Sequence, residues 1–148
     1  MRPKKSLGQN FLTSEAIAEE IVSAGGVSRE DAVLEVGPGE GILTEILLEK
    51  AGRVVAVETD GRLVEFLRKK FADRKNLEIV YGDILKFNPT NYKLRTKDYK
   101  IIANIPYYIT SFFLRKFLGS DFQPSKMVLM VQKEVAERIV GLPIKQKK

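Results

Sequence analysis

The 148-residue sequence contains no cysteine and no histidine. Without these side chains the protein has no thiolate nucleophile, no imidazole general base and no disulfide, and it lacks nearly all the ligands of zinc sites. No apolar run approaches the roughly 18 residues of a membrane-spanning helix, and the basic start, MRPKKSLGQNF, has no apolar core of signal-peptide length. We therefore expect a cytoplasmic protein that uses no metal and associates with no membrane. Its chemistry must depend on carboxylates, amides, hydroxyls, backbone groups or an organic cofactor.

What the sequence does contain is typical of a single globular domain. Hydrophobic residues make up 44% and charged residues 30%, and we expect one monomeric domain over residues 1–148. The 25 Lys and Arg exceed the 19 Asp and Glu, and the resulting net charge of +6 favours polyanionic partners such as nucleic acid. Mild basicity is also common in proteins that bind no nucleic acid, so charge alone does not decide the question.

Predicted strands and helices alternate along the chain. Apolar residues from Ile17 to Ala24 recur at helical spacing after a capping Ser14, and Gly25 and Gly26 end this first helix. Apolar and β-branched runs predict strands at residues 32–36, 53–58, 77–83, 99–104 and 126–132. Helical periodicity predicts helices near residues 42–51, 63–71 and 109–117, and the polar segment 84–98 is predicted to be a loop. This order predicts an α/β fold, a Rossmann-like doubly wound sheet of mostly parallel strands with helices on both faces.

A glycine-rich turn, EVGPGEG at residues 35–41, joins the first predicted strand to the helix after it. Gly37, Gly39 and Gly41 allow a sharp turn and a close approach of ligand to backbone, at the place where doubly wound folds bind ligands. The same pattern occurs in tight turns that bind nothing, and only its strand-to-helix context favours a binding site. Glu58 ends the next strand, 21 residues after Gly37, where a carboxylate can accept hydrogen bonds from both hydroxyls of a ribose.

The ligand that these residues suggest carries adenosine. Ile42 stands where a dinucleotide fingerprint has its last glycine, so a nicotinamide cofactor is poorly supported, whereas S-adenosylmethionine has no pyrophosphate to accommodate. Asp83 ends the third strand and can accept a hydrogen bond from an adenine amino group, and Ile84 can pack on the ring. Taken alone, Asp83 is more simply interpreted as a turn residue. Three strand ends that carry Gly37, Glu58 and Asp83 at one edge of the sheet together predict a pocket for an adenosine-bearing ligand.

The fourth predicted strand ends in NIPYY, residues 104–108, and is expected to adjoin the first strand at the same edge. An exocyclic amine of a base is a poor nucleophile that carries two N–H donors. The side-chain oxygen of Asn104 and the carbonyl of Ile105 can accept both, and can stabilise the positive charge that develops as the nitrogen attacks a sulfonium methyl group. Pro106 stiffens the turn, and Tyr107 can stack on the base. Methyl transfer of this kind needs no general base, which fits the absence of histidine.

A set of stretches follows in a characteristic order: KSLGQNFL (5–12), EVGPGEGILT (35–44), VETD (57–60), GD (82–83), NIPYYITS (104–111) and MVQKEVAERI (130–139). Together they closely resemble the ribosomal RNA adenine dimethyltransferases of the KsgA type, over essentially the whole chain. The resemblance implies a class I S-adenosylmethionine-dependent methyltransferase fold. It also implies dimethylation of N6 on two adjacent adenosines near the 3′ end of small-subunit ribosomal RNA, with the immature small ribosomal subunit as partner.

The resemblance gives roles to residues that physical reasoning alone leaves without one. In the family the GQNFL segment closes over the cofactor, so Asn10 and Leu12 match cofactor-binding positions, with Gln9 and Phe11 beside them. Tyr107 matches the aromatic residue that stacks on the target base. The remaining matches to family cofactor positions are Gly37, Glu58, Asp83 and Asn104.

The sequence departs from the family pattern at its C-terminal end. Family members continue past QKEVAERI with further strands and a helical C-terminal domain, whereas this sequence ends VGLPIKQKK. We expect a sheet without its last two strands, whose fifth strand has an open edge, and a chain that binds S-adenosylmethionine but methylates RNA poorly alone. Two alternatives stay open: a large-subunit ribosomal RNA adenine N6-methyltransferase that confers antibiotic resistance, and a non-catalytic RNA-binding factor in ribosome assembly.

Overall fold

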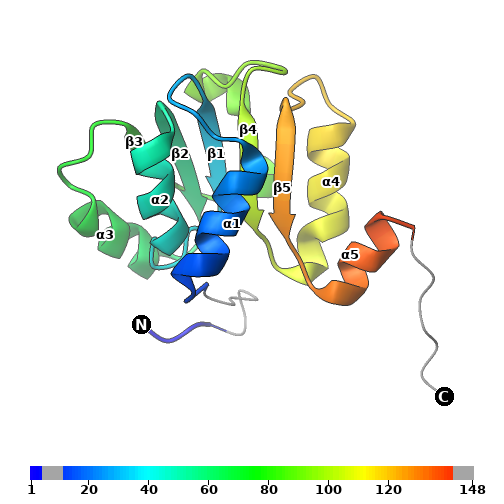
Figure 1. The fold of residues 1–148 in the computed structure, drawn as a ribbon. Coiled ribbons are helices and arrows are strands. Elements are labelled where there is room, and N and C mark those ends of the chain that lie inside the picture. The colour runs from blue at the N-terminus through cyan, green and yellow to red at the C-terminus, as the bar shows by residue number, and fades with distance from the viewer. Residues whose placement is uncertain (5–11, 142–148) are drawn as a thin grey trace.

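Residues 1–4 and 12–141 are described by a computed structural model, in which five parallel strands form one sheet in the order β3-β2-β1-β4-β5 (Figure 1). The strands are β1 (Ala32–Val36), β2 (Arg53–Glu58), β3 (Leu77–Tyr81), β4 (Lys100–Asn104) and β5 (Lys126–Met130). The central strand β1 pairs with β2 on one side and with β4 on the other. The chain therefore changes direction across the sheet at β1, which is the topological switch point of a doubly wound fold. The predicted fold class is confirmed.

Helices cover both faces of the sheet. They are α1 (Glu15–Gly25), α2 (Ile42–Lys50), α3 (Gly61–Lys70), α4 (Thr110–Leu118) and α5 (Lys133–Ile139), with 3-10 helices η2 (Ile84–Lys86), η3 (Pro89–Tyr92) and η4 (Tyr107–Ile109). One face packs against α1, α2 and α3, and the other packs against α4 and the segment that contains η2. Within the described part of the chain, no helix combines the length and the apolar character needed to cross a membrane.

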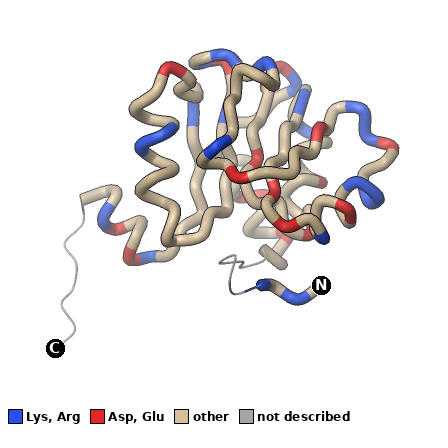
Figure 2. Tube along the Cα trace, turned by 180° about the vertical axis from the view of Figure 1, so that it is seen from behind, with Lys and Arg blue, Asp and Glu red and all other residues tan. Residues whose placement is uncertain are grey.

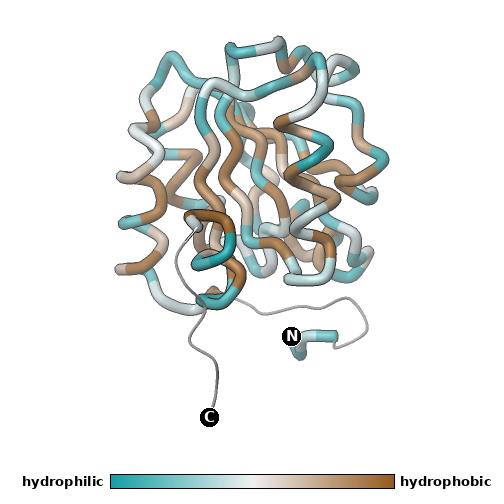
Figure 3. Tube along the Cα trace, turned by 90° about the vertical axis from the view of Figure 1, so that its right-hand side faces the viewer, coloured by the Kyte–Doolittle hydropathy of each residue, from teal (hydrophilic) through white to brown (hydrophobic). Residues whose placement is uncertain are grey.

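Successive residues of each strand point alternately into two cores. Val33, Val54 and Ile102 belong to the core beneath α1 and α2, whereas Leu34 and Val55 belong to the core beneath α4. All of them are fully buried, and the strands are nearly continuous hydrophobic runs, as a sheet covered on both faces requires. Figure 3 shows the apolar colouring concentrated along these central strands.

The first helix shows how local sequence sets the boundaries of an element. The Ser14 side chain accepts a hydrogen bond from the backbone N–H of Ile17 at 3.3 Å, and so caps the N-terminus of α1. Gly26 follows the helix in the left-handed conformation, with φ of 57°, and its N–H donates to Ser23. Both ends agree with the prediction.

Some details differ from the prediction. β3 ends at Tyr81 and β5 at Met130, so both strands are shorter than predicted, and the predicted loop at 84–98 contains η2 and η3. α5 was not predicted, because it is short and buries no residue, and therefore has no periodic apolar face to detect. Among the described residues β5 pairs with β4 alone. On the side seen in Figure 2, Lys and Arg are interspersed with Asp and Glu over the turns and outer helices.

Candidate active site

A pocket of about 280 Å³ opens at the carboxyl ends of the strands. Its lining comes from β1, β2 and β4 and from the turn that follows β3, which is the crevice where doubly wound folds bind ligands. The structure brings together six residues singled out from the sequence: Gly37, Glu58, Asp83, Ile84, Asn104 and Pro106. The strand ends that the sequence placed at one edge thus converge on one cavity.

The glycine-rich turn is a tightly packed junction between strand ends. Gly37 has a φ of 71°, and a Cβ on this residue would lie 2.5 Å from the main-chain oxygen of Asn104. The N–H of Gly37 donates to the carbonyl of Val57 at 3.1 Å. Gly41 also has positive φ, but a Cβ there would meet the ring of Phe71 at 2.7 Å. Gly37 therefore shapes the pocket, while Gly41 makes room for packing against the end of α3.

Glu58 presents a fixed carboxylate at the end of β2. Its side chain is only 5% exposed and accepts backbone N–H bonds from Gly39 at 3.4 Å and from Asp60 at 3.1 Å. Burial raises the pKa of Glu58, and the backbone hydrogen bonds oppose that rise. Gly39 does not itself line the pocket, but its N–H helps to hold the carboxylate that does. The result is an oriented acceptor at the pocket wall.

Asp83 and Ile84 form the wall at the end of β3. Asp83 Oδ1 accepts the N–H of Leu85 at 2.9 Å and caps η2, so the turn role weighed for Asp83 from the sequence is present. The same residue also lines the pocket, beside the almost fully buried Ile84. Turn residue and pocket residue are therefore compatible roles.

The residues of the NIPYY segment lie in three different environments: the pocket, the core and the surface. Asn104 and Pro106 line the pocket, whereas the Ile105 side chain is buried in the core beneath α4. Tyr108 also lines the pocket, while Tyr107 is 62% exposed and meets the Tyr108 ring edge-on, with centroids 6.0 Å apart. Sequence reasoning singled out Tyr107 and missed Tyr108. The doubled tyrosine was the only available signal, and it does not say which ring faces the cavity.

Behind the glycine-rich turn lies a buried acid that sequence reasoning missed. Glu35 is fully buried on β1, and the Thr44 hydroxyl lies 2.7 Å and 2.9 Å from its two carboxylate oxygens. Burial raises the pKa of Glu35 to about 8, Thr44 opposes this shift, and the charge of Glu58 adds to it. Burial therefore favours the protonated form of Glu35. Its signal in the sequence was a single acid within the apolar run AVLEV.

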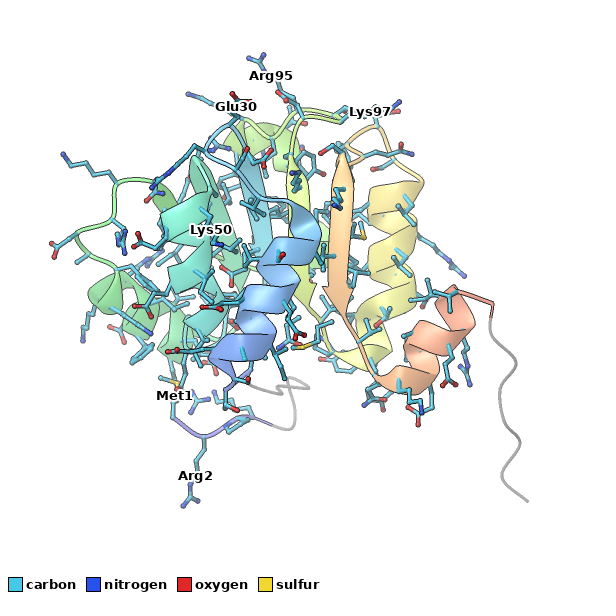
Figure 4. The ribbon with its side chains drawn as sticks, viewed as in Figure 1. Met1, Arg2, Glu30, Lys50, Arg95 and Lys97 are labelled. Carbon is cyan, nitrogen blue, oxygen red and sulfur yellow. The ribbon has the colours of Figure 1, made fainter. Side chains whose placement is uncertain are left out.

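Of the N-terminal residues assigned by resemblance, only Leu12 is described, and it packs against the core beneath α1 and α2. Asn10, with Gln9 and Phe11, lies outside the described residues. The α-amino group of Met1 lies 3.0 Å from a Glu40 carboxylate oxygen, beside the glycine-rich turn. Figure 4 shows Met1 and Arg2 at the carboxyl edge of the sheet, opposite the edge where Glu30, Arg95 and Lys97 lie. The described N-terminal residues thus lie at the edge that contains the pocket.

Acidic side chains near the pocket do not form a metal site. Among residues 1–4 and 12–141, no group of three His, Cys, Asp or Glu side chains could hold a metal ion. The polar side chains around the cavity instead include single carboxylates and an amide at the ends of separate strands, with hydroxyl groups beside them. Such isolated acceptors suit an organic ligand that carries several hydrogen-bond donors.

Comparison with known proteins reveals close relatives. A family model described as ribosomal RNA adenine dimethylase matches residues 1–148. A Dehalococcoides mccartyi protein named ribosomal RNA small subunit methyltransferase A is 46% identical over 141 residues, which cover 95% of this chain and 48% of that protein. A Ligilactobacillus salivarius protein of the same name is 45% identical, covering 95% of this chain and 49% of that protein. The chain thus spans about half the length of the curated relatives that it matches.

Two solved structures of related methyltransferases also resemble this chain. A dimethyladenosine transferase from Plasmodium falciparum has a TM-score of 0.78 and 33% identity, covering 88% of this chain and 46% of that one. The 23S rRNA methyltransferase ErmE has a TM-score of 0.78 and 30% identity, covering 89% of this chain and 52% of that one.

Proposed function

Because the chain belongs to the ribosomal RNA adenine dimethylase family, we propose that residues 1–148 form the S-adenosylmethionine-binding catalytic domain of a small-subunit ribosomal RNA adenine N6,N6-dimethyltransferase. Its substrate is two adjacent adenosines near the 3′ end of that RNA, and it acts in the cytoplasm during ribosome assembly. The observation that carries the proposal is the convergence of the predicted strand-end residues on one pocket. Relatives named as small-subunit enzymes, at 46% identity, favour this RNA over the 23S RNA named for ErmE, at 30%.

The residues around the pocket fit the parts of S-adenosylmethionine. The fixed Glu58 carboxylate suits two ribose hydroxyls, and Asp83 with Ile84 suits the amino group and the face of adenine. The acidic lining also attracts the positive charge of a sulfonium group. A volume of about 280 Å³ is near the lower end of small-molecule pockets, roughly 300 to 1,000 Å³, and suits the nucleoside portion of the cofactor.

The proposed chemistry places the target amine at the end of β4. The bound cofactor supplies a methyl group, whose bond to sulfur breaks as a bond to the adenine nitrogen forms. The Asn104 side-chain oxygen and the Ile105 carbonyl accept the two N–H groups and stabilise the charge that develops on nitrogen, while Pro106 offers no competing donor. The proton leaves to water after the transfer, and the rate comes from positioning and electrostatics. A chain without histidine can perform this reaction.

Exposed aromatic rings beside the pocket suit an unpaired base. Tyr107 and Tyr108 are 62% and 49% exposed, their rings meet edge-on with centroids 6.0 Å apart, and Tyr108 lines the pocket. Large exposed apolar side chains grouped in this way mark an interaction surface. Stacking of a base on an aromatic ring contributes about 1–3 kcal/mol. We assign Tyr107 as the ring that stacks on the target adenine.

Two measurements, made one after the other, test the proposal. Titration calorimetry of the folded chain with S-adenosylmethionine is expected to show one site per chain, and a folded sample that binds none would refute the proposal. Single-turnover transfer of a labelled methyl group to immature small subunits, with the chain in excess, is expected to label the two adjacent adenosines. Label in large-subunit RNA instead would support the antibiotic-resistance alternative.

Replacement of Asn104 separates catalysis from a purely structural role in assembly. Asn104→Ala is expected to abolish methyl transfer while the chain stays folded. If a strain that carries Asn104→Ala matures its small subunits normally without methylation, the assembly-factor alternative gains support. Loss of both methylation and maturation would tie the two functions to the same residue.

A further inference from the structure

Lys116 contacts the wall of the pocket from outside the cavity. It lies in the last turn of α4, and its Nζ donates to the carbonyl of Leu85 at 3.0 Å and to that of Phe87. Both carbonyls are at the C-terminal end of η2, where helical carbonyls have no partner within the helix. A side chain from α4 therefore ends a helix that begins 32 residues earlier, at Ile84.

Lys116 is partly buried in this position. Burial lowers the pKa of Lys116, and the nearby Asp83 carboxylate acts in the opposite direction. The ammonium also lies 5.6 Å from the ring centroid of Phe117. A lysine without a structural task keeps its charged head in water. Lys116 is instead partly buried and directs its ammonium to two carbonyls and a ring face.

The segment that Lys116 holds is the wall proposed to receive adenine. Asp83, Ile84 and Leu85 all line the pocket. A 3-10 helix of one turn has little stability of its own. Asp83 fixes its start by accepting the N–H of Leu85, and Lys116 fixes its end. The position of the wall thus depends on both residues.

We propose that Lys116 is a positioning residue for adenine recognition. By holding the carbonyls of Leu85 and Phe87, it keeps the Asp83 carboxylate and the Ile84 side chain at the places where they face the base. α4, the helix that carries Lys116, directly follows η4 and the NIPYY turn. α4 therefore connects the part of the site proposed to hold the target amine with the part proposed to bind the cofactor base. The inference rests on the proposed function, because it requires a pocket that binds adenosine.

The test compares two ligands that differ only in the base. Calorimetry gives the dissociation constants of S-adenosylhomocysteine and of S-inosylhomocysteine, which lacks the amino group that Asp83 would accept. Lys116→Met is expected to weaken binding of the adenosyl ligand about tenfold, the effect of losing one charge-assisted hydrogen bond, here the bond from the adenine amino group to the Asp83 carboxylate. The variant is also expected to show a smaller preference for the adenosyl ligand over the inosyl ligand. Lys116→Arg, which keeps the cation, is expected to restore part of that preference. Arg115→Met, a matched loss of charge in the same helical turn, is expected to leave both affinities unchanged.

Each outcome decides the matter. Equal weakening of both ligands by Lys116→Met would mean a merely structural role and would overturn the inference, as would unchanged affinities. Hydrogen exchange provides a second measurement, because the amides of Lys86 and Phe87 are bonded within the turn that Lys116 holds; they are expected to exchange faster in Lys116→Met. Failure of the wild-type chain to bind either ligand would overturn the proposed function and this inference together.

Discussion

The backbone of Gly37 lies directly against the main-chain carbonyl of Asn104, so that a Cβ on Gly37 would be 2.5 Å from that oxygen. Asn104 ends β4, and Gly37 directly follows the neighbouring parallel strand β1. One belongs to the turn proposed to approach the cofactor, and the other is proposed to hold the target amine. Under the proposed function, their contact would place the two reactants on adjacent strand ends, where a methyl group has little distance to cross.

Gly37→Ala is therefore expected to destabilise the protein and to abolish cofactor binding. A left-handed alanine costs about 1–2 kcal/mol, and overlap with a backbone carbonyl adds about 1–3 kcal/mol. Urea unfolding measures the loss. Gly82→Ala is the control, because no heavy atom of the described residues lies within 4 Å of its Cβ position; its effect is expected to stay within about 1 kcal/mol. Equal losses at the two glycines would contradict the packing argument.

The sequence predicted the fold and the convergence of the strand ends because both follow from short-range patterns. Parallel strands put their carboxyl ends at one edge, so Glu58 and Asp83 could be placed together without knowing any contact between them. Their exact partners were not predictable in the same way. Gly39 and Asp60 hold Glu58 through backbone N–H groups, and nothing in their side chains signals this.

The residues that sequence reasoning missed depend either on contacts between distant segments or on the exact geometry of a turn. The carbonyls that Lys116 binds lie 31 and 29 residues earlier in the chain, and in the sequence Lys116 is one more basic residue at a helix end. Tyr107 and Tyr108 differ only in the direction that a 3-10 turn gives to each ring. A pattern of residue types carries no information about either relationship.

Glu58 gives cofactor binding a predicted dependence on pH. Ribose hydroxyls donate best to an ionised carboxylate, and burial raises the pKa of Glu58 above its ordinary value of 4.5. Binding of S-adenosylmethionine is therefore expected to weaken as the pH falls through this raised pKa, at a higher pH than an ordinary glutamate would require. Calorimetry from neutral pH into the acidic range measures the change.

Glu58→Gln is the matched variant for that titration. It is expected to bind about 10- to 100-fold more weakly at neutral pH, because hydrogen bonds to a charged group are replaced by weaker ones. Its affinity should not change over the same acidic interval. A wild-type chain whose affinity parallels that of Glu58→Gln at every pH would show that the Glu58 carboxylate does not take part in binding.

The aromatic rings beside the pocket are expected to act on RNA rather than on the cofactor. Tyr107→Ala should weaken binding of an unpaired adenosine-containing RNA by about 1–3 kcal/mol, the contribution of one stacked base, and should leave S-adenosylmethionine affinity unchanged. Tyr107→Phe, which keeps the ring, is the control and should bind both ligands normally. Fluorescence anisotropy with a labelled RNA measures the first affinity and calorimetry the second. Loss of cofactor binding in Tyr107→Ala would contradict this assignment.

Glu35 links stability to pH through a proton held in the core. Its pKa is raised by burial to about 8 in the folded chain, against an ordinary value of 4.5. Between these values the folded state binds a proton that the unfolded state releases, so the contribution of Glu35 lowers the free energy of unfolding as pH rises, by at most about 1.4 kcal/mol per pH unit. Below pH 4.5 both states are protonated and the contribution vanishes.

Glu35→Gln removes this titration while keeping a group that can bond to Thr44. Urea unfolding is expected to give nearly equal stabilities for variant and wild type near pH 5, and a clear advantage for the variant above pH 8, where the wild type must bury a charge. Thr44→Val is expected to extend the decline to higher pH without changing the pH at which it begins, because the Thr44 hydroxyl stabilises the ionised form only in the folded chain. Parallel stability profiles for Glu35→Gln and the wild type would mean that Glu35 titrates alike in the folded and unfolded chain, and that its burial is compensated by contacts other than Thr44.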